Sequence, residues 1–73
     1  MYGDKPRQKS MNLTPREIQI LKLIMAELKS EEIAHQLGIS LPTVVTHRRH
    51  LFLKLGVKSV VGLVKEALRM GLA

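Results

Sequence analysis

The chain has 73 residues, 12 of them Lys or Arg and 6 Asp or Glu, so its formal net charge is +6 at pH 7. A chain of this length forms one small domain, and because it contains no cysteine, neither disulfide bonds nor thiolate metal sites can stabilise it. Its apolar runs are far shorter than the ~20 residues that span a bilayer, and its N-terminus is polar and basic where a secretory signal is apolar. We therefore expect a soluble, cytoplasmic domain that does not interact with the membrane.

Residues 1–11 differ from the rest of the chain because they show no apolar periodicity and contain Gly3 and Pro6. Such a composition is typical of a flexible tail or an interdomain linker. The segment is either a native linker or a remnant of cloning, and its basic residues are expected to add only weak attraction to phosphate. We predict a single folded domain at residues 12–73.

Two short helices are predicted in the first half of this domain, near residues 15–26 and 30–37. Thr14, Pro15 and Glu17 form a capping-box signature, with the Thr as N-cap, the Pro at the first helical position and the Glu at the third. Apolar residues then recur at helical spacing. The second helix begins with acidic residues and is followed by Gly38, which suits a left-handed helix end.

A third helix is predicted at residues 41–55, only three residues after the second. Ser40 suits its N-cap, and Pro42 is tolerated in its first turn. Two helices joined by so short a turn are typical of a helix-turn-helix, here at about residues 28–47.

The predicted third helix has two different faces. The apolar face, which must be buried, consists of Val44, Leu51 and Leu55. The opposite face is mixed polar and cationic and consists of Val45, Thr46, Arg49, His50 and Leu53. No acidic residue occurs between Glu32 and Glu66, so this face is positive, and its width suits the major groove of DNA. A single Tyr and a single Phe argue against stacking on single strands, so double-stranded DNA is the predicted partner.

A fourth helix is predicted at residues 60–70, between Ser59 as its N-cap and Gly71. The expected fold is therefore all-α, with four helices. The apolar stripes predict a core made of Leu21, Ile24, Ile33, Leu37, Val44, Leu51, Leu55, Val64 and Leu68.

The sequence predicts neither a catalytic centre nor a metal site. Catalysis needs a nucleophile with a base, or paired carboxylates, whereas Ser and Thr here serve as caps and Glu residues lie at helix starts. His47 and His50 share one helix and His35 lies on the preceding one, but they point in different directions without an Asp or Cys to complete a ligand set. We expect no enzyme activity and no cofactor. His47 is predicted to pack at a helix interface, and His50 to lie near DNA.

Taken together, these segments resemble the LuxR-type helix-turn-helix domain, which occurs at the C-terminus of FixJ-like and NarL-like response regulators and of quorum-sensing receptors. The matching segments are LTPRE at 13–17, EIAHQLGIS at 32–40, TV at 43–44, His47, KLGV at 54–57, Ala67, and GL at 71–72. The resemblance implies sequence-specific DNA binding by a transcriptional regulator, as the output domain of a two-component response regulator. It also implies a recognition helix in the major groove and a homodimer formed through the last helix.

The resemblance further implies roles for individual residues. Those predicted to read bases are Val45, Thr46 and Arg49. Those predicted to contact phosphate are Thr43 and Lys54, by the resemblance, and Arg48 and Lys58, by their charge. Those predicted for dimerisation are Val60, Val61, Val64 and Leu68. The expected partners are double-stranded DNA, a second copy of the chain, an upstream receiver or ligand-binding domain, and RNA polymerase.

The chain departs from the family pattern at a few positions. Family members usually have a small residue in place of Glu27, a capping Ser or Thr in place of Lys29, and a basic residue in place of Val45 or Leu53. The alternative function is a protein-interaction module, in which the apolar last helix docks a partner and the basic face is only solvated. Retention on duplex DNA at low salt separates the two functions.

Overall fold

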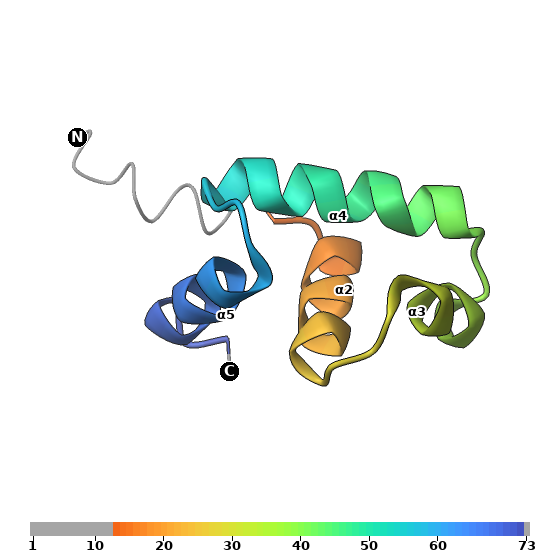
Figure 1. The fold of residues 1–73 in the computed structure, drawn as a ribbon, viewed down its shortest axis with the longest axis horizontal. Helices are drawn as coiled ribbons and strands as arrows, with labels where there is room; N and C mark the ends of the chain where they lie inside the picture. Colours follow the sequence, from red (N-terminus) through yellow and green to blue (C-terminus); the bar gives the residue numbers. More distant parts are fainter. Residues whose placement is uncertain (1–12, 73) are drawn as a thin grey trace.

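The computed structural model describes residues 13–72, and these residues form four helices and no strand (Figure 1). The helices are α2 (Pro15–Met25), α3 (Ser30–Leu37), α4 (Leu41–Leu55) and α5 (Val60–Arg69). In Figure 1, α4 lies along the top, with α3, α2 and α5 beneath it from right to left. The predicted all-α fold and the four predicted helices are confirmed, and only the ends of the first and last helices fall one residue earlier than expected.

The start of α2 is fixed by the predicted capping box. The backbone N–H of Thr14 donates to Glu17 Oε1 at 3.0 Å, and the backbone N–H of Glu17 donates to Thr14 Oγ1 at 3.1 Å. Leu13, which precedes the cap, is buried and joins the core, while Ile18 packs against it. This arrangement sets the direction in which α2 enters the domain.

All four helices end in the same hydrogen-bond pattern. After α2, the N–H of Leu28 donates to the Leu23 carbonyl at 3.1 Å and the N–H of Glu27 donates to the Ile24 carbonyl at 2.8 Å. Equivalent pairs of bonds follow the other three helices. This motif places one residue in the left-handed conformation after each helix. These residues are Glu27, Gly38, Gly56 and Gly71, with φ between 67° and 76°.

The turn between α3 and α4 consists of three residues, as predicted. Gly38 takes the left-handed conformation, with φ 68°, and Ile39 packs against the core. Ser40 then caps α4, accepting a hydrogen bond from the backbone N–H of Thr43 at 3.3 Å. The turn holds α3 and α4 together as a helix-turn-helix.

The core lies where α2 and α3 pack under α4. Its largest fully buried side chains are Ile20, Leu21, Ile33, Val44, Leu51 and Leu63. The predicted core residues that the structure buries are Leu21, Ile24, Ile33, Val44, Leu51 and Leu55. Leu37 and Val64 are only half-buried.

The prediction that Leu68 belongs to the core is wrong, because its side chain is 58% exposed. The buried side chains of α5 are Leu63 and Ala67. Because α5 packs against the rest of the domain along one side only, the line of side chains that it buries is narrower than the stripe of apolar residues in its sequence. Leu68 follows Ala67 by one residue and is rotated by roughly 100° away from that line.

Candidate nucleic-acid interface

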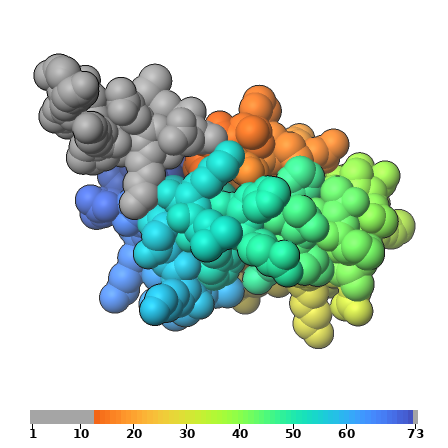
Figure 2. Space-filling model, turned by 90° about the horizontal axis from the view of Figure 1, so that it is seen from above, coloured from red at the N-terminus to blue at the C-terminus, as the bar shows by residue number. Residues whose placement is uncertain are grey.

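The face of α4 that points away from the other helices is the candidate interface. The buried residues of α4 are Val44, Leu51 and Leu55. About half a turn away the side chains are exposed, and Leu53 is the most exposed of the large apolar ones, at 72%. Figure 2 looks onto this side of the molecule, and α4 crosses the middle of the view.

The three residues predicted to read bases lie together on this outer face. Val45, Thr46 and Arg49 are all exposed. Arg49 follows Val45 by one helical turn and precedes Leu53 by one turn, so these three side chains form a row along the helix. No acidic residue lies in α4, and none lies elsewhere between residues 33 and 65. No carboxylate of α4 itself therefore lies beside this row.

The residues predicted to contact phosphate lie on both sides of this row. Thr43 is exposed, and its hydroxyl lies 2.8 Å from the Ser40 hydroxyl. Lys58 is exposed in the turn between α4 and α5. Arg48 is half-buried, and its guanidinium carbon lies 5.7 Å from the centre of the Phe52 ring. Two of these side chains are thus already held by neighbours on α4 or at its cap.

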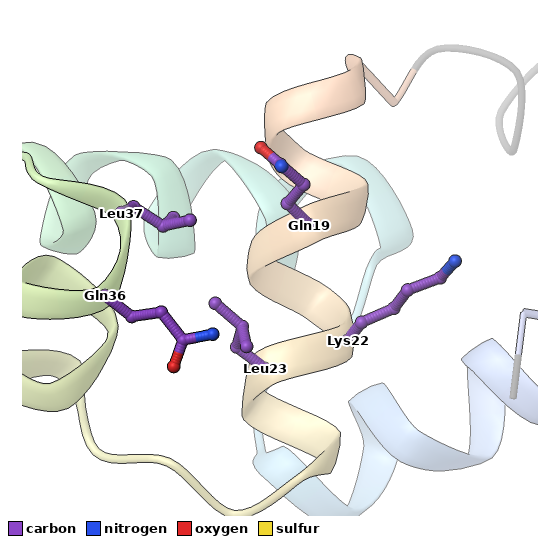
Figure 3. Close-up of a pocket in the computed structure, with 5 residues that line it drawn as sticks. All are labelled: Gln19, Lys22, Leu23, Gln36 and Leu37. Atoms are coloured by element: carbon purple, nitrogen blue, oxygen red, sulfur yellow. The ribbon is translucent and has the colours of Figure 1, made fainter.

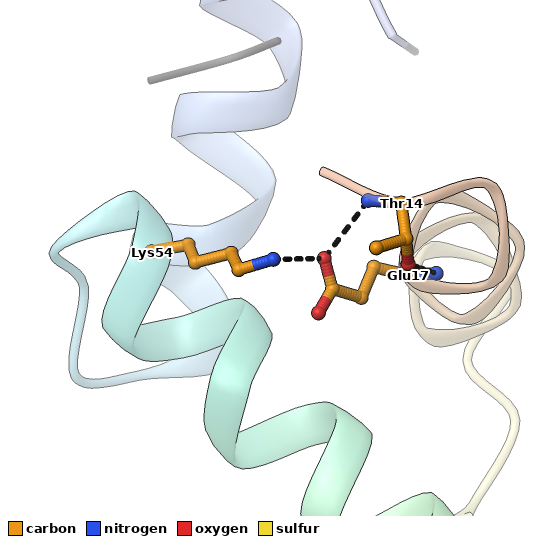
Figure 4. Close-up of polar contacts among 3 residues, drawn as sticks. All are labelled: Thr14, Glu17 and Lys54. Atoms are coloured by element: carbon orange, nitrogen blue, oxygen red, sulfur yellow. Dashed lines mark hydrogen bonds and ion pairs between the residues drawn. The ribbon is translucent and has the colours of Figure 1, made fainter. Parts of the chain in front are cut away.

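Lys54 has a partner within the fold that the sequence reasoning missed. Its Nζ lies 2.9 Å from Oε1 of Glu17, the same oxygen that accepts from the backbone N–H of Thr14 (Figure 4). The Glu17 side chain is 4% exposed and that of Lys54 is 35% exposed. The contact therefore links the start of α2 to the last turn of α4. The positions are 37 residues apart in sequence, so no local pattern predicts the pair.

The environment of Glu17 keeps its carboxylate charged. Burial by itself raises the pKa of Glu17, but the hydrogen bond from the Thr14 backbone and the ammonium group of Lys54 outweigh it. The pKa of Glu17 therefore lies below the ordinary value of a glutamate.

A second ion pair joins Glu66 and Arg69 on α5 at 2.7 Å and is largely exposed on the arginine side.

The residues predicted for dimerisation lie on α5, at the C-terminal end of the described chain. Val60, Val61 and Leu68 are exposed, with Val61 at 65%, and Val64 is half-buried. Their spacing places them on one side of the helix. They form an apolar strip beside the buried line of Leu63 and Ala67.

A shallow groove of about 230 Å³ lies between α2 and α3. Figure 3 shows its lining residues, which are Gln19, Lys22, Leu23, Gln36 and Leu37.

Across residues 13–72 no cluster of three or more His, Cys, Asp or Glu side chains is arranged to hold a metal ion. His35 and His50 are exposed and His47 is half-buried. None of the helices in this range is long and apolar enough to cross a membrane.

The family profile described as "Bacterial regulatory proteins, luxR family" matches residues 11–67 of the sequence. The chain belongs to the LuxR family. Its predicted resemblance to LuxR-type helix-turn-helix domains is thereby confirmed. LuxR-family transcriptional regulators are DNA-binding proteins and not enzymes.

Individual relatives agree with this assignment. The chain is 43% identical over 72 residues to the transcriptional regulatory protein MctR of Rhizobium johnstonii, covering 99% of this chain and 34% of MctR. It is 49% identical over 59 residues to the uncharacterized response regulatory protein YgeK of Escherichia coli, covering 81% of this chain and 40% of YgeK. It is 44% identical over 57 residues to the oxygen regulatory protein NreC of Staphylococcus aureus, covering 78% of this chain and 26% of NreC.

A solved structure shares the fold of this chain. The response regulator ChrA of a heme-sensing two-component system superimposes with a TM-score of 0.78 and 36% sequence identity, over 84% of this chain and 30% of ChrA. The chain thus spans well under half the length of each of these relatives.

Proposed function

We propose that this LuxR-family domain binds double-stranded DNA in a sequence-specific manner, with α4 in the major groove. The observation that supports the proposal is the outer face of α4, where Val45, Thr46 and Arg49 are exposed and no carboxylate is present. An α-helix with its side chains is about 10–12 Å across, and the major groove is about 12 Å wide.

Base reading is assigned to the middle of the outer face. Arg49 is exposed there, with Val45 one turn before it. A guanidinium placed in this way donates two parallel hydrogen bonds to O6 and N7 of guanine, which is worth about 1–3 kcal/mol of discrimination against another base. The methyl groups of Val45 and Thr46 suit contact with the C5-methyl of thymine.

Phosphate contacts are assigned to the two flanks of α4 and to the turn that follows it. Rotation along the helix places Arg48 roughly 100° to one side of Arg49, and Thr43 roughly 120° to the other side. Lys54 shares the flank of Thr43, and its ammonium carries three donors, so its bond to Glu17 is compatible with a phosphate contact. Lys58 is exposed in the following turn. These contacts fix the orientation of the helix, and the bases supply the sequence preference.

We also propose that two copies pair through the exposed apolar strip of α5, made of Val60, Val61, Val64 and Leu68. A two-fold contact uses the same patch on both copies, and a strip on a single helix side satisfies that requirement. A dimer of this kind binds two half-sites about one helical turn of DNA apart.

The wider context is a proposal as well. The names of YgeK and ChrA, a response regulatory protein and a response regulator, support the same role for the protein that contains this domain. In that role the domain at residues 12–73 is the output domain, and residues 1–11 join it to an upstream receiver or ligand-binding domain. The location is then the cytoplasm, and RNA polymerase is a further partner.

The test of base reading compares two neighbouring arginines. A duplex selected from a random library serves as the operator, and a scrambled duplex of equal length serves as the control. Arg49→Ala is expected to lower the ratio of operator to control affinity by about 5- to 150-fold, which corresponds to the loss of about 1–3 kcal/mol of discrimination. Arg48→Ala is expected to weaken both duplexes equally. All affinities are measured by fluorescence anisotropy at one salt concentration. If Arg49→Ala keeps the full ratio while losing affinity, base reading is not its role.

The test of pairing uses the two most exposed residues of the strip. Val61→Asp and Leu68→Asp place a charge on an exposed position, so the fold is expected to be retained. Both variants are expected to bind a single half-site as well as the wild type does, but to lose cooperative binding to a duplex with two half-sites. Lys65→Ala, an exposed position on the same helix, is the matched control. Unchanged cooperativity in both aspartate variants would exclude the strip as the dimer contact.

One observation favours a second candidate, a protein-interaction module. The apolar strip of α5 leaves Val61 and Leu68 largely exposed in the single chain. In that case the strip docks another protein, and the cations of α4 are only solvated. A duplex DNA cellulose column separates the two candidates, because a DNA-binding domain is retained at low salt and released as salt rises, whereas an interaction module flows through.

A further inference from the structure

The guanidinium group of Arg48, on α4, lies over an aromatic ring. Its guanidinium carbon lies 5.7 Å from the centre of the Phe52 ring, within the ~6 Å at which a cation is attracted to a ring face. The two residues are four positions apart, so they lie above one another on one helix side. Phe52 is half-buried and packs against the core, and the ring is therefore a fixed platform.

The charge of Arg48 is not neutralised within the part of the chain that the structure describes. The ion pairs there are Lys54 with Glu17 and Arg69 with Glu66. Arg48 makes neither an ion pair nor a hydrogen bond with residues 13–72, and within that range its charge interacts with the Phe52 ring. A buried or structural arginine usually satisfies its donors on acceptors of the protein. Arg48 is instead held by the attraction between its charge and the Phe52 ring.

A guanidinium group that is attracted to a ring can still bind an anion. The Phe52 ring attracts the positive charge of the group from one side, whereas the five N–H donors fan outward in the guanidinium plane. A phosphate oxygen can therefore accept from the donors that point away from the ring while the cation stays over it. An arginine already held in this way loses less side-chain freedom when it binds than one that moves freely in water.

We propose that Phe52 is a positioning residue for DNA binding, which holds the guanidinium of Arg48 ready for a backbone phosphate at one flank of α4. This inference rests on the proposed DNA-binding function, and it adds a residue that itself touches no DNA. It also distinguishes Arg48 from Lys58, another predicted phosphate contact, which is exposed in a turn. The ring acts on affinity through Arg48 alone and has no influence on sequence preference.

The test is a double-mutant cycle measured with one operator duplex and one scrambled duplex at fixed salt. Phe52→Leu keeps an apolar side chain against the core and removes the ring. Because immobilising a long side chain costs about 0.5–1.5 kcal/mol, Phe52→Leu is expected to weaken both duplexes by about two- to tenfold. In the Arg48→Ala background the same change is expected to have no effect on affinity. Phe52→Tyr, which keeps the ring, is expected to bind as the wild type does.

Two further measurements separate positioning from a structural role. Arg48→Ala is expected to make the negative slope of log K against log salt less steep by about 0.9. Phe52→Leu keeps the cation, so it is expected to leave the slope unchanged. In the free protein, the side-chain protons of Arg48 are expected to show upfield ring-current NMR shifts that vanish in Phe52→Leu. Thermal unfolding of each variant checks that the fold persists. If Phe52→Leu is unfolded at the assay temperature, Phe52→Met replaces it in the cycle.

The outcomes distinguish this inference from the proposed function. A wild-type domain that binds no duplex overturns both. If the wild-type domain binds duplex DNA, but Phe52→Leu lowers affinity equally in the presence and absence of Arg48, the positioning role is overturned and the proposed DNA binding is not. The positioning role is also overturned if Phe52→Leu binds DNA with wild-type affinity, or if the Arg48 protons show no ring-current shifts.

Discussion

Of the four left-handed helix ends within residues 13–72, three are filled by glycine and one by Glu27. Its φ is 68°, the value that Gly38 also adopts after α3. A side chain in this conformation brings Cβ close to the following carbonyl oxygen, at a cost of roughly 1–2 kcal/mol. Glycine avoids this cost, but it loses more chain entropy on folding, which cancels part of the gain. We therefore predict that Glu27→Gly raises the free energy of unfolding by about 0.5–1 kcal/mol.

The matched control for this prediction is Glu27→Ala, which removes the charge and keeps Cβ. Chemical denaturation of both variants and of the wild type measures the difference. If the free energy of unfolding rises only in Glu27→Gly, backbone strain is the cause. Equal gains in both variants would assign the effect to the glutamate charge.

Glu17 is the residue whose titration is expected to couple to stability. Its folded pKa lies below the ordinary value, so its stabilising contribution is present above the unfolded pKa of about 4.3 and is lost as the pH falls through the folded pKa. We predict that the free energy of unfolding of the wild type falls below about pH 4.5, and that Glu17→Gln removes part of this dependence. Urea denaturation between pH 3 and pH 7 measures both proteins. An unchanged pH dependence in Glu17→Gln would show that other carboxylates cause the loss.

The partner of Glu17 complicates any test of DNA binding at Lys54. Removing the ammonium leaves a carboxylate that is 4% exposed without its ion pair. Because Lys54 itself is 35% exposed, we predict that Lys54→Ala costs about 1–3 kcal/mol of stability, less than for a fully buried pair. Thermal unfolding without DNA measures this cost. A melting temperature equal to that of the wild type would show that the pair contributes nothing to stability.

At the scale of elements, α4 carries both the core of the domain and its candidate interface. Leu51 is fully buried, whereas Leu53, two residues later, is 72% exposed. We predict that Leu51→Ala costs about 2–5 kcal/mol of stability, because it leaves a cavity between α4 and the helices beneath it. The same change at Leu53 is expected to stay within about 0.5 kcal/mol. Equal costs in urea denaturation would mean that the buried side of α4 is wrongly assigned.

At the scale of the whole molecule, charge is distributed unevenly along the fold. Residues 33–65, which include all of α4, contain no acidic residue, while Glu31 and Glu32 lie at the start of α3. We predict that duplex binding weakens with salt at a slope of about −0.9 per neutralised phosphate, or about −4 for four contacts per domain. Lys58→Ala is expected to reduce the steepness by about 0.9. Lys22→Ala, an exposed cation on α2, is the control and is expected to leave the slope unchanged.

Local features of the sequence determined the helices and the turn between α3 and α4. Thr14, Ser40 and Ser59 each cap the helix that follows, as predicted, because a cap depends on residues within one turn of it. The same reasoning located the outer face of α4, since a face of a helix depends only on its period. The family resemblance also followed from the sequence, through short segments in the right order.

Contacts between distant residues were decided only by the tertiary structure. The position of Leu68 outside the core depends on which side of α5 packs against the domain, and several rotations of its apolar stripe satisfy the same sequence pattern. The bond from Lys54 to Glu17 depends on the crossing of α4 over the start of α2, which brings together residues 37 positions apart. Helical periodicity fixes where a side chain lies around its own helix. It does not fix the rotation and position of that helix relative to its neighbours, which are set by the packing of all four helices together.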